Sequence, residues 1–538
     1  YDFKPLTDVH LETVIGGKQT LKSRLKILLF IGFLIFSIAC INYTNLSTIQ
    51  IITRAKEVGI KKVTGSSISR LFLNAYLETT LIVLLALFLG GLLMVWALPY
   101  FNDLTGRALS LHFFNNPLLL YGFPVALIVA TLVAGTYPAA KLAKISPTTA
   151  FKGLIPQKSR SFSFRNALII GQFVVCIAMI CITLLFSKQI SYISSQHLGF
   201  DPDQILVIKD AFLAETAPFK QAVLNIPYVE TASYSNTIPG RHYNDQGIHI
   251  KGTAPSSQHA HVFKGDYELK NIFNLELVSG RWFSEDIEKD KATCILNETA
   301  IKTLNIEDPL NTILDDGSWS YDSVDEVRII GVVKDFNFKS LQWPIEAMQI
   351  YPRSEEQFYD GQFLTLQIAQ TDYQQVITQV KAIWDQQTGN LPFEYFFLDQ
   401  DFNKNYQEEA QLRKIFLWFS LLAIFVTCLG LLGLSSFLIL RRTKEIGIRK
   451  VNGANVPQII RMLNYDFIKL VIIALAIATP VAYLVTSRWL ESFAYKTSLS
   501  WWVFALAGAS AILIALFTVS WQSWKAAVRN PVDALRYE

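Results

Sequence analysis

The residues best suited to interaction chemistry lie in a twelve-residue motif that occurs twice. RAKEVGIKKVTG, from Arg54 to Gly65, returns as RTKEIGIRKVNG, from Arg442 to Gly453, with eight identical positions at an offset of 388 residues. In each copy an acidic residue precedes a basic residue by four positions. Carboxylates and cations at that spacing form ion pairs along one face of a helix. The motif therefore predicts a charged recognition surface that the chain presents twice.

Each copy is expected to form a short helix along the inner membrane face. Gly65 and Gly453 suit the position that ends a helix, while Ser67 and Asn455 can cap the next helix, with Pro457 in its first turn. Two interpretations fit the basic residues: a loop that contacts phospholipid, or a protein-docking surface. A repeat with eight of twelve positions identical exceeds what charge balance requires, which favours docking. The predicted docking residues are Arg54, Lys56, Glu57, Gly59, Lys61, Lys62 and Gly65, and Arg442, Lys444, Glu445, Gly447, Arg449, Lys450 and Gly453.

An acidic residue follows each motif at the same offset. Glu78 and Asp466 lie one turn inside the apolar run that comes after the motif. Acidic residues near a helix N-terminus are favoured by the helix dipole alone. The alternative is that they hold the elbow, which we define as the bend between the short helix and the long helix after it, by pairing with a nearby basic residue.

Catalytic chemistry has little support in the sequence. The chain contains no G-x-x-x-x-G-K-[ST] phosphate loop and no nucleophile-elbow pattern. His259 and His261 can share one strand face, but no third metal ligand follows from spacing. The middles of the apolar runs lack ionisable residues, which argues against an ion or proton pathway. We therefore expect no enzyme activity, and no cofactor or metal bound by this chain.

The composition places these motifs in a membrane protein. The 538 residues are 51% hydrophobic and 17% charged. Residues 188–410 hold 17 basic against 33 acidic residues, whereas the remainder holds 31 against 11. Such segregation predicts that the two parts lie in different compartments.

Seven apolar runs are long enough to span a bilayer. The loops that carry the repeated motif, and the loop 141–165, are rich in Lys and Arg and are expected to be cytoplasmic, as is the C-terminus. Residues 188–410 and the short loops 99–116 and 488–500 then lie outside. The predicted spans are 27–52, 71–98, 117–140, 166–186, 415–440, 470–486 and 501–521.

The outer segment is predicted to be an α+β domain. Strand-like runs occur at 204–209, 327–333, 363–369 and 393–398, with a helical stripe at 373–384 between the last two. The polar stretch 403–414 is expected to continue unbroken into the next span. The fold class is thus an α-helical membrane protein with seven transmembrane helices and an extracytoplasmic α+β domain.

The repeat also predicts the domain organisation. Because the second copy follows a helix and an outer domain, we expect an eighth helix and another such domain before the first copy. The predicted parts are a remnant of that domain (1–20), a first unit with three transmembrane helices (21–153), a cytoplasmic linker (154–165), a transmembrane helix (166–187), the outer domain (188–410), and a second three-helix unit with a cytoplasmic tail (411–538).

These motifs together resemble the FtsX/MacB-type ABC transporter permeases, in the double-length form with two FtsX-like units. The two basic motifs, extended to Ser66 and Ala454, resemble the cytoplasmic signature of that family. SPTTAFKG (146–153) and NPVDALRYE (530–538) are similar to its endings. LVSGRWFSED (277–286), ILNETAIKTL (295–304) and GVVKDFNFKSL (331–341) are similar to its MacB-like outer domain.

The resemblance implies a mechanical function in a bacterial inner membrane. The basic motifs are then coupling helices in grooves of a separate cytoplasmic ATPase dimer, which holds ATP and Mg, and ATPase closure moves the outer domain. The first hypothesis is export or efflux with a periplasmic adaptor and an outer-membrane channel. The alternatives are regulation of a cell-wall hydrolase, lipoprotein release, and a membrane-anchored scaffold without an ATPase. Membrane lipids are expected contacts, and nucleic acid is not.

Overall fold

The fold is described from a computed structural model. It describes residues 21–105, 108–110, 117–143, 146, 164–214, 216–253, 258–286, 289–315, 326–353, 362–369 and 373–528. The predicted remnant 1–20, residues 154–163 of the predicted linker and the ending 530–538 lie outside these residues, as does nearly all of the ending 146–153.

The chain divides into two compact units. The membrane unit comprises Tyr1–Lys188, Gln411–Trp489 and Ser498–Glu538, and the outer unit comprises Gln189–Ala410 together with Leu490–Thr497. The short segment 490–497 connects two membrane helices and yet packs with the outer unit. The sequence predicted only that this loop lies outside the membrane.

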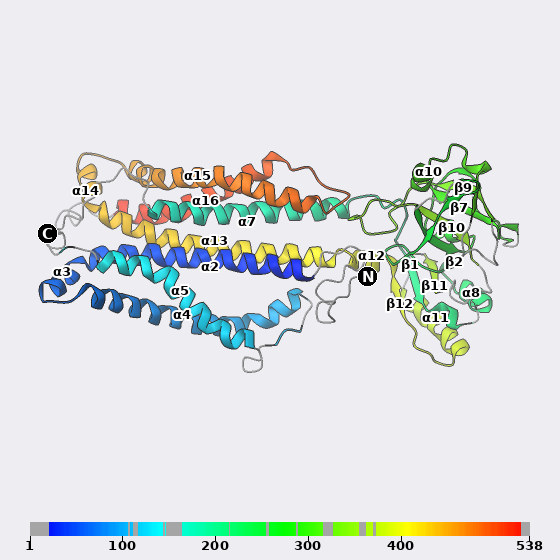
Figure 1. Ribbon diagram of the computed structural model, residues 1–538, viewed down its shortest axis with the longest axis horizontal. Helices are drawn as coiled ribbons and strands as arrows, with labels where there is room; N and C mark the ends of the chain where they lie inside the picture. The colour runs from blue at the N-terminus through cyan, green and yellow to red at the C-terminus, as the bar shows by residue number, and fades with distance from the viewer. Residues whose placement is uncertain are drawn as a thin grey trace. The chain divides into compact units, whose positions relative to one another are not determined.

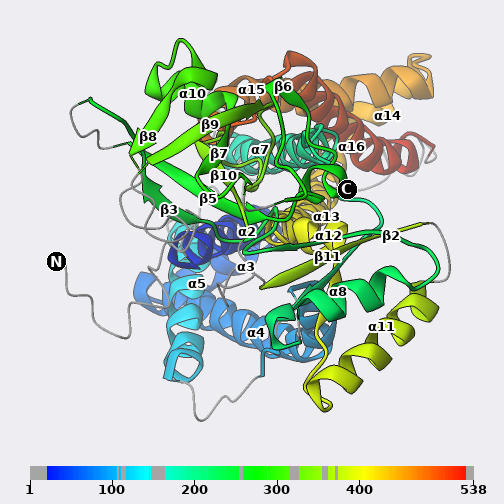
Figure 2. The ribbon, with the colours of Figure 1, turned by 90° about the vertical axis from the view of Figure 1, so that its right-hand side faces the viewer.

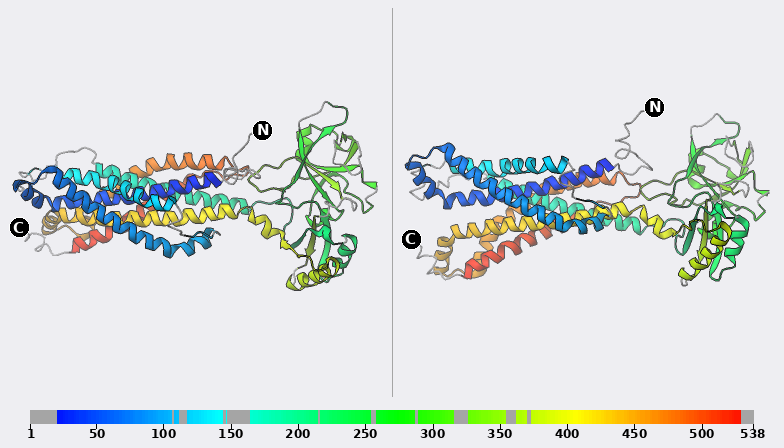
Figure 3. Two further views of the ribbon diagram at one scale, coloured as in Figure 1. Left: turned by 60° about the horizontal axis from the view of Figure 1, so that its bottom comes forward. Right: turned by 90° about the horizontal axis from the view of Figure 1, so that it is seen from below.

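Seven long helices of the membrane unit are apolar enough to cross a bilayer, among the described residues. All seven predicted spans are confirmed, and most are longer than predicted because polar turns extend them. The helices run side by side, with the short α3 and α14 at one end of the bundle (Figures 1 and 3). The long helices are α2 (Leu21–Thr53), α4 (Ile68–Thr105), α5 (Pro117–Ala143), α7 (Phe164–Ser194), α13 (Gln407–Arg441), α15 (Val456–Leu490) and α16 (Trp501–Val528); the short ones are α3 (Ala55–Val63) and α14 (Thr443–Val451).

Small residues allow the helices of the second half to pack closely. Ala474 and Ala478 of α15 are fully buried in one cluster with Ala507 of α16. A Cβ at Gly508 of α16 would lie 2.5 Å from Cδ2 of Leu475 on α15. Without a hydrophobic driving force between helices in lipid, such close backbone approach and dispersion contacts stabilise the bundle.

The outer unit is built on one mixed sheet of twelve strands among the described residues. Ten strands follow the order β12-β1-β11-β2-β5-β10-β7-β9-β8-β4, while β3 pairs with β5 and β6 with β9. The pairs β5–β10 and β7–β9 are parallel and the others antiparallel. The strands are β1 (Ile205–Lys209), β2 (Val229–Ser235), β3 (Asn244–Gly247), β4 (His249–Ile250), β5 (His259–Gly265), β6 (Leu277–Gly280), β7 (Thr293–Asn297), β8 (Ile313–Asp315), β9 (Glu326–Val333), β10 (Met348–Pro352), β11 (Phe363–Ile368) and β12 (Tyr395–Phe397).

Helices cover the sheet, and two of them lie on the same face. Phe219 of α8 and Trp384 of α11 are fully buried against Leu206, Leu364 and Leu366 of the sheet. Figure 2 shows these two helices together beside β11 and β2. The helices are α8 (Thr216–Leu224), α9 (Leu269–Ile272), α10 (Glu298–Leu304), α11 (Tyr373–Thr388) and α12 (Leu398–Lys404), with single 3₁₀ turns at Ala211–Leu213 and Pro309–Asn311.

The α+β class is confirmed, and one local prediction needs correction. β11, α11 and β12 form the predicted β-α-β unit, with β1 between its two strands. The stretch 403–414 is not one helix, because α12 ends at Lys404 and α13 begins at Gln407. Tertiary contacts account for the break: Asn405 Nδ2 donates to the Gly240 carbonyl at 3.2 Å, and the Tyr406 hydroxyl accepts from the Leu341 N–H at 2.8 Å.

Candidate functional site

The short helix α3 has defined ends formed by backbone hydrogen bonds. At its start the carbonyl of Arg54 accepts from the Val58 N–H at 3.0 Å. At its end the Ser66 N–H donates to the Lys61 carbonyl at 2.9 Å, and the Gly65 N–H donates to the Lys62 carbonyl at 3.1 Å. This pair of bonds is a Schellman motif. It requires φ of +95° at Gly65, a conformation in which glycine lacks the penalty of a Cβ.

The second short helix, α14, repeats this geometry. The Ile446 N–H donates to the Arg442 carbonyl at 2.8 Å, and the Ala454 N–H donates to the Arg449 carbonyl at 2.9 Å. Gly453 takes φ of +89°. The twelve-residue repeat therefore encodes the same helix with the same stop signal in both halves.

An ion pair spans each elbow. Arg54 Nη1 lies 2.6 Å from Glu78 Oε2, and Arg442 Nη2 lies 3.0 Å from Asp466 Oδ2. The hydrogen bond to Glu78 raises the pKa of Arg54 above its ordinary value, although partial burial opposes the shift. The geometry places each acidic residue against the basic residue that precedes its short helix, as the second of the two interpretations predicts.

The pairs at helical spacing are formed as well. Lys61 Nζ lies 2.6 Å from Glu57 Oε1, and Arg449 Nη2 lies 2.8 Å from Glu445 Oε1. The hydrogen bond from Lys61 lowers the pKa of Glu57. All four side chains are half-exposed, so both pairs are available at the surface of the unit.

Each short helix has one buried and one exposed apolar side. Val58 and its repeat equivalent Ile446 are buried. Ile60 and Ile448 are each 48% exposed, and Val63 and Val451 are 67% and 65% exposed. We call these four exposed apolar residues with the adjacent ion pairs the docking face, after the role predicted from the sequence: Glu57, Ile60, Lys61 and Val63 on α3, and Glu445, Ile448, Arg449 and Val451 on α14.

The prediction from sequence did not include these exposed apolar residues, because it selected charged residues and glycines. The identity of Ile60 with Ile448 and of Val63 with Val451 in the repeat was the signal that could have indicated them. Among the predicted residues, Lys62 donates to the Ala143 carbonyl at 2.6 Å and so binds the end of α5. Lys56 is exposed, Gly59 and Gly447 are buried, and Lys450 is half-buried; the side chain of Lys444 lies outside the described residues.

Family models match most of the chain. The model of the FtsX-like permease C-terminal domain matches residues 29–147 and again residues 417–531, and the model of the MacB-like periplasmic core domain matches residues 167–383. The chain belongs to the FtsX/MacB-type permeases. The two separate FtsX-like matches confirm the internal repeat. Permeases of this family are multi-pass transmembrane components, and family membership implies an ABC ATPase as partner.

Solved structures similar to this permease include a periplasmic region and an extracellular domain of other transporters. The periplasmic region of MacB from Actinobacillus actinomycetemcomitans is 14% identical, with 40% of this chain and 97% of that chain covered and a TM-score of 0.29. A domain of a putative permease from Porphyromonas gingivalis is 15% identical, with 36% and 90% covered and a TM-score of 0.27. The extracellular domain of YknZ, from Gram-positive bacteria, is 13% identical, with 36% and 97% covered and a TM-score of 0.27. No curated protein matches the sequence.

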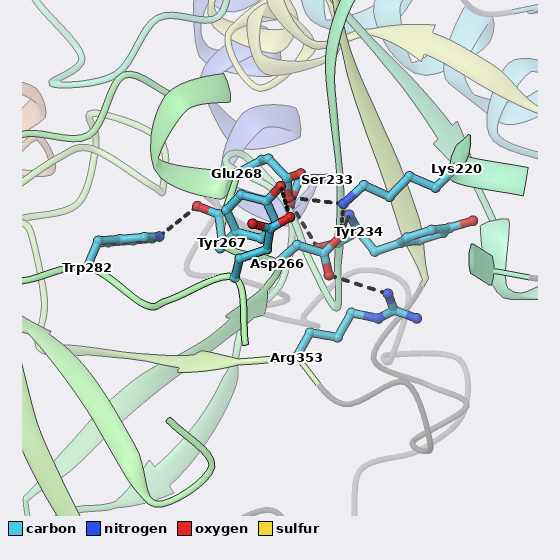
Figure 4. Close-up of polar contacts among 9 residues, drawn as sticks. Lys220, Ser233, Tyr234, Asp266, Tyr267, Glu268, Trp282 and Arg353 are labelled. Carbon is cyan, nitrogen blue, oxygen red and sulfur yellow. Dashed lines mark hydrogen bonds and ion pairs between the residues drawn. The ribbon is translucent and has the colours of Figure 1, made fainter. Parts of the chain in front are cut away.

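The outer unit of the permease contains a buried charge cluster with a structural role. Lys220 of α8 binds Asp266 at 2.8 Å and Glu268 at 3.0 Å, and Arg353 lies 3.4 Å from Asp266 (Figure 4). Burial opposes the charge of Lys220, but the two carboxylates outweigh it and raise the pKa of the amine. Two cations balance two anions, so the cluster anchors α8 to the segments that follow β5 and β10.

Proposed function

We propose that this permease is the membrane subunit of an ABC exporter. In this proposal α3 and α14 dock on a cytoplasmic ATPase dimer, and ATP hydrolysis by that partner moves the outer domain. The observation that carries the proposal is the duplicated docking face, with matching exposure of Ile60 and Ile448 and of Val63 and Val451. A surface that contacts only lipid or water does not need the same exposed apolar residues in both copies of the repeat.

The docking face is suited to a groove in a protein. Exposed apolar residues beside ion pairs combine burial energy with orientation, which is the usual composition of a protein interface. Because Val58 and Ile446 anchor the helices on their other side, the exposed residues are held in place before a partner binds. Two equal faces suit a partner with two equal grooves, such as an ATPase homodimer.

The orientation follows from the basic residues around the docking helices. Positive charge near the ends of spans favours the cytoplasmic side, so α3, α14 and the C-terminus are placed there and the acidic outer unit outside. ATP and Mg are held by the partner. The elbow pairs Arg54–Glu78 and Arg442–Asp466 then connect a displacement of the docking helices to α4 and α15.

Export is the work that we assign to this motion, with peptides or small toxic molecules as the substrate class. A periplasmic adaptor and an outer-membrane channel are the partners of that proposal. Affinity purification of the full-length protein, followed by mass spectrometry, tests it. An ATPase with an adaptor or a channel supports export, whereas recovery of a cell-wall hydrolase or of no ATPase contradicts it.

The docking role has a direct test in the permease–ATPase complex. Ile60→Asp combined with Ile448→Asp places two carboxylates at the centre of the docking face. We expect loss of co-purification and of permease-stimulated ATP hydrolysis. Leu213→Asp is a matched control, because Leu213 is also an exposed apolar residue, 42% exposed, but belongs to the outer unit. Stimulation that survives the double substitution would overturn the docking proposal.

A further inference from the structure

A close contact joins α2 of the first half to α13 of the second half. Asn42 Nδ2 donates to the Val426 carbonyl at 2.6 Å, and Asn42 is 8% exposed. Its amide lies against Gly430, where an added Cβ would be 2.0 Å from Asn42 Oδ1. One turn further, a Cβ at Gly433 would be 2.3 Å from Cδ2 of Leu46. Both side chains thus come from α2, and both glycines come from α13.

The repeat relates the two positions of the first contact to each other. At the offset of 388 residues that superposes the two motifs, Asn42 corresponds to Gly430. Contact between two equivalent positions is the arrangement expected beside a local twofold axis between the repeated units. The two residues differ in size, so the side chains on the two sides of this contact are unequal.

This difference in side-chain size distinguishes between the possible pairings of α2 and α13. If α2 met a second α2, Asn42 would meet Asn42 where the structure has room for one amide only. If α13 met a second α13, Gly430 would meet Gly430 and leave a void. Helices in a membrane associate through close packing and small residues, and an interface that penalises the wrong partner gains specificity.

We propose that the Asn42–Gly430 and Leu46–Gly433 pairs select the pairing of the two halves of one chain over pairing with the same half of a second copy. The two halves of the membrane unit then pair within a single chain. The proposal concerns assembly of the permease and stands whether or not the docking role of α3 and α14 is correct.

An exchange of the two residues tests the proposal in the full-length protein in detergent or nanodiscs. Gly430→Asn places asparagine at both positions and is expected to lower the apparent Tm. Adding Asn42→Gly restores one asparagine and one glycine with their positions exchanged. If the two positions lie beside the axis, this double variant recovers most of the lost apparent Tm and remains a single-chain particle by native mass spectrometry.

A smaller substitution controls for the effect of any side chain added to a membrane helix. Gly430→Ala is expected to lower the apparent Tm, because its Cβ meets Asn42. Gly90→Ala on α4 is the matched control, since nothing lies within 4 Å of a Cβ there, and it is expected to leave the Tm unchanged.

Two results would overturn the proposal. One is an exchanged double variant that is no more stable than Gly430→Asn alone. The other is a wild-type particle of two chains that dissociates on Gly430→Asn, because Asn42 and Gly430 would then join two copies.

Discussion

Arg54 binds both carboxylate oxygens of Glu78, with Nη1 at 2.8 Å from Oε1 and 2.6 Å from Oε2. Arg54 precedes α3 and Glu78 lies in α4, so the contact joins the start of the short helix to the membrane helix after it. Arg442 and Asp466 repeat the contact across the second elbow. The side chains of the first pair are 44% and 46% exposed. Exposed ion pairs contribute less than about 1 kcal/mol to stability. We therefore expect removal of the pair to affect the orientation of α3 more than the stability of the fold.

Removal of both elbow pairs is expected to uncouple the permease while leaving it folded. Glu78→Gln with Asp466→Asn should change the apparent Tm little and reduce permease-stimulated ATP hydrolysis by the partner. Arg54→Glu combined with Glu78→Arg again places opposite charges across the first elbow. In a chain with an intact second elbow, this exchange should recover part of the stimulation that is lost when the first pair is removed. Equal stimulation in the Glu78→Gln/Asp466→Asn chain and the wild type would show that these pairs do not position the docking helices.

Alanine at the helix-terminating glycines should disturb the ends of the docking helices. Gly65 and Gly453 have φ of +95° and +89°, where a Cβ costs roughly 1–2 kcal/mol. A Cβ at either position meets nothing within 4 Å, so the cost is conformational and not steric. We expect Gly65→Ala with Gly453→Ala to weaken ATPase binding, measured as the affinity of the complex. Gly90→Ala serves as control, and an unchanged affinity in the double variant would contradict the prediction.

Local and periodic features were predictable from the sequence, and tertiary contacts were not. The seven spans, the stop at Gly65 and the pair of Glu57 with Lys61 follow from residues within one or two helical turns. The contact of Lys62 with Ala143 joins segments 81 residues apart, and the contact of Asn42 with Val426 joins segments 384 residues apart. The break after Lys404 likewise depends on Gly240 and Leu341, far away in the sequence. Such contacts are selected by packing of the whole unit, which no local pattern encodes.

Asp290 should make the stability of the outer unit dependent on pH. Its side chain is fully buried and accepts hydrogen bonds from Arg281 at 2.6 and 3.1 Å and from Ser284. Burial opposes ionisation, but these bonds outweigh it and lower the pKa of Asp290. The stabilisation is therefore present above the unfolded-state pKa near 4 and is lost as pH falls through the lower folded-state value.

The measurement for Asp290 is the apparent Tm of the full chain from pH 7 to pH 3. Asp290→Asn leaves Arg281 without its ionic partner and should cost about 2 kcal/mol at pH 7. The difference in apparent Tm between Asp290→Asn and the wild type should shrink below pH ~4. Asp286→Asn, at a half-exposed neighbouring position, is the control and should have little effect. A difference for Asp290→Asn that stays constant across this pH range would contradict the argument.

Gln189 should determine whether the segment 490–497 stays packed in the outer unit. Its buried side chain accepts from the Thr497 N–H and donates to the Tyr495 carbonyl, both at 2.8 Å. Gln189→Leu keeps the approximate size but leaves both backbone groups unpaired, and each unpaired buried group costs about 1–3 kcal/mol. We expect faster chymotrypsin cleavage at Phe493 and Tyr495.

The matched control for Gln189 is Gln196→Leu, the same substitution two residues beyond the end of α7. Gln196 is half-buried, and its backbone N–H donates to the Ile193 carbonyl at 3.2 Å. Its replacement should therefore leave the cleavage rate unchanged. Equal rates for the two variants would mean that the remaining contacts of the segment, such as the Ala494 N–H to the Gln342 carbonyl at 3.0 Å, are sufficient to hold it. Faster cleavage in Gln189→Leu alone would show that Gln189 holds the segment 490–497 in the outer unit.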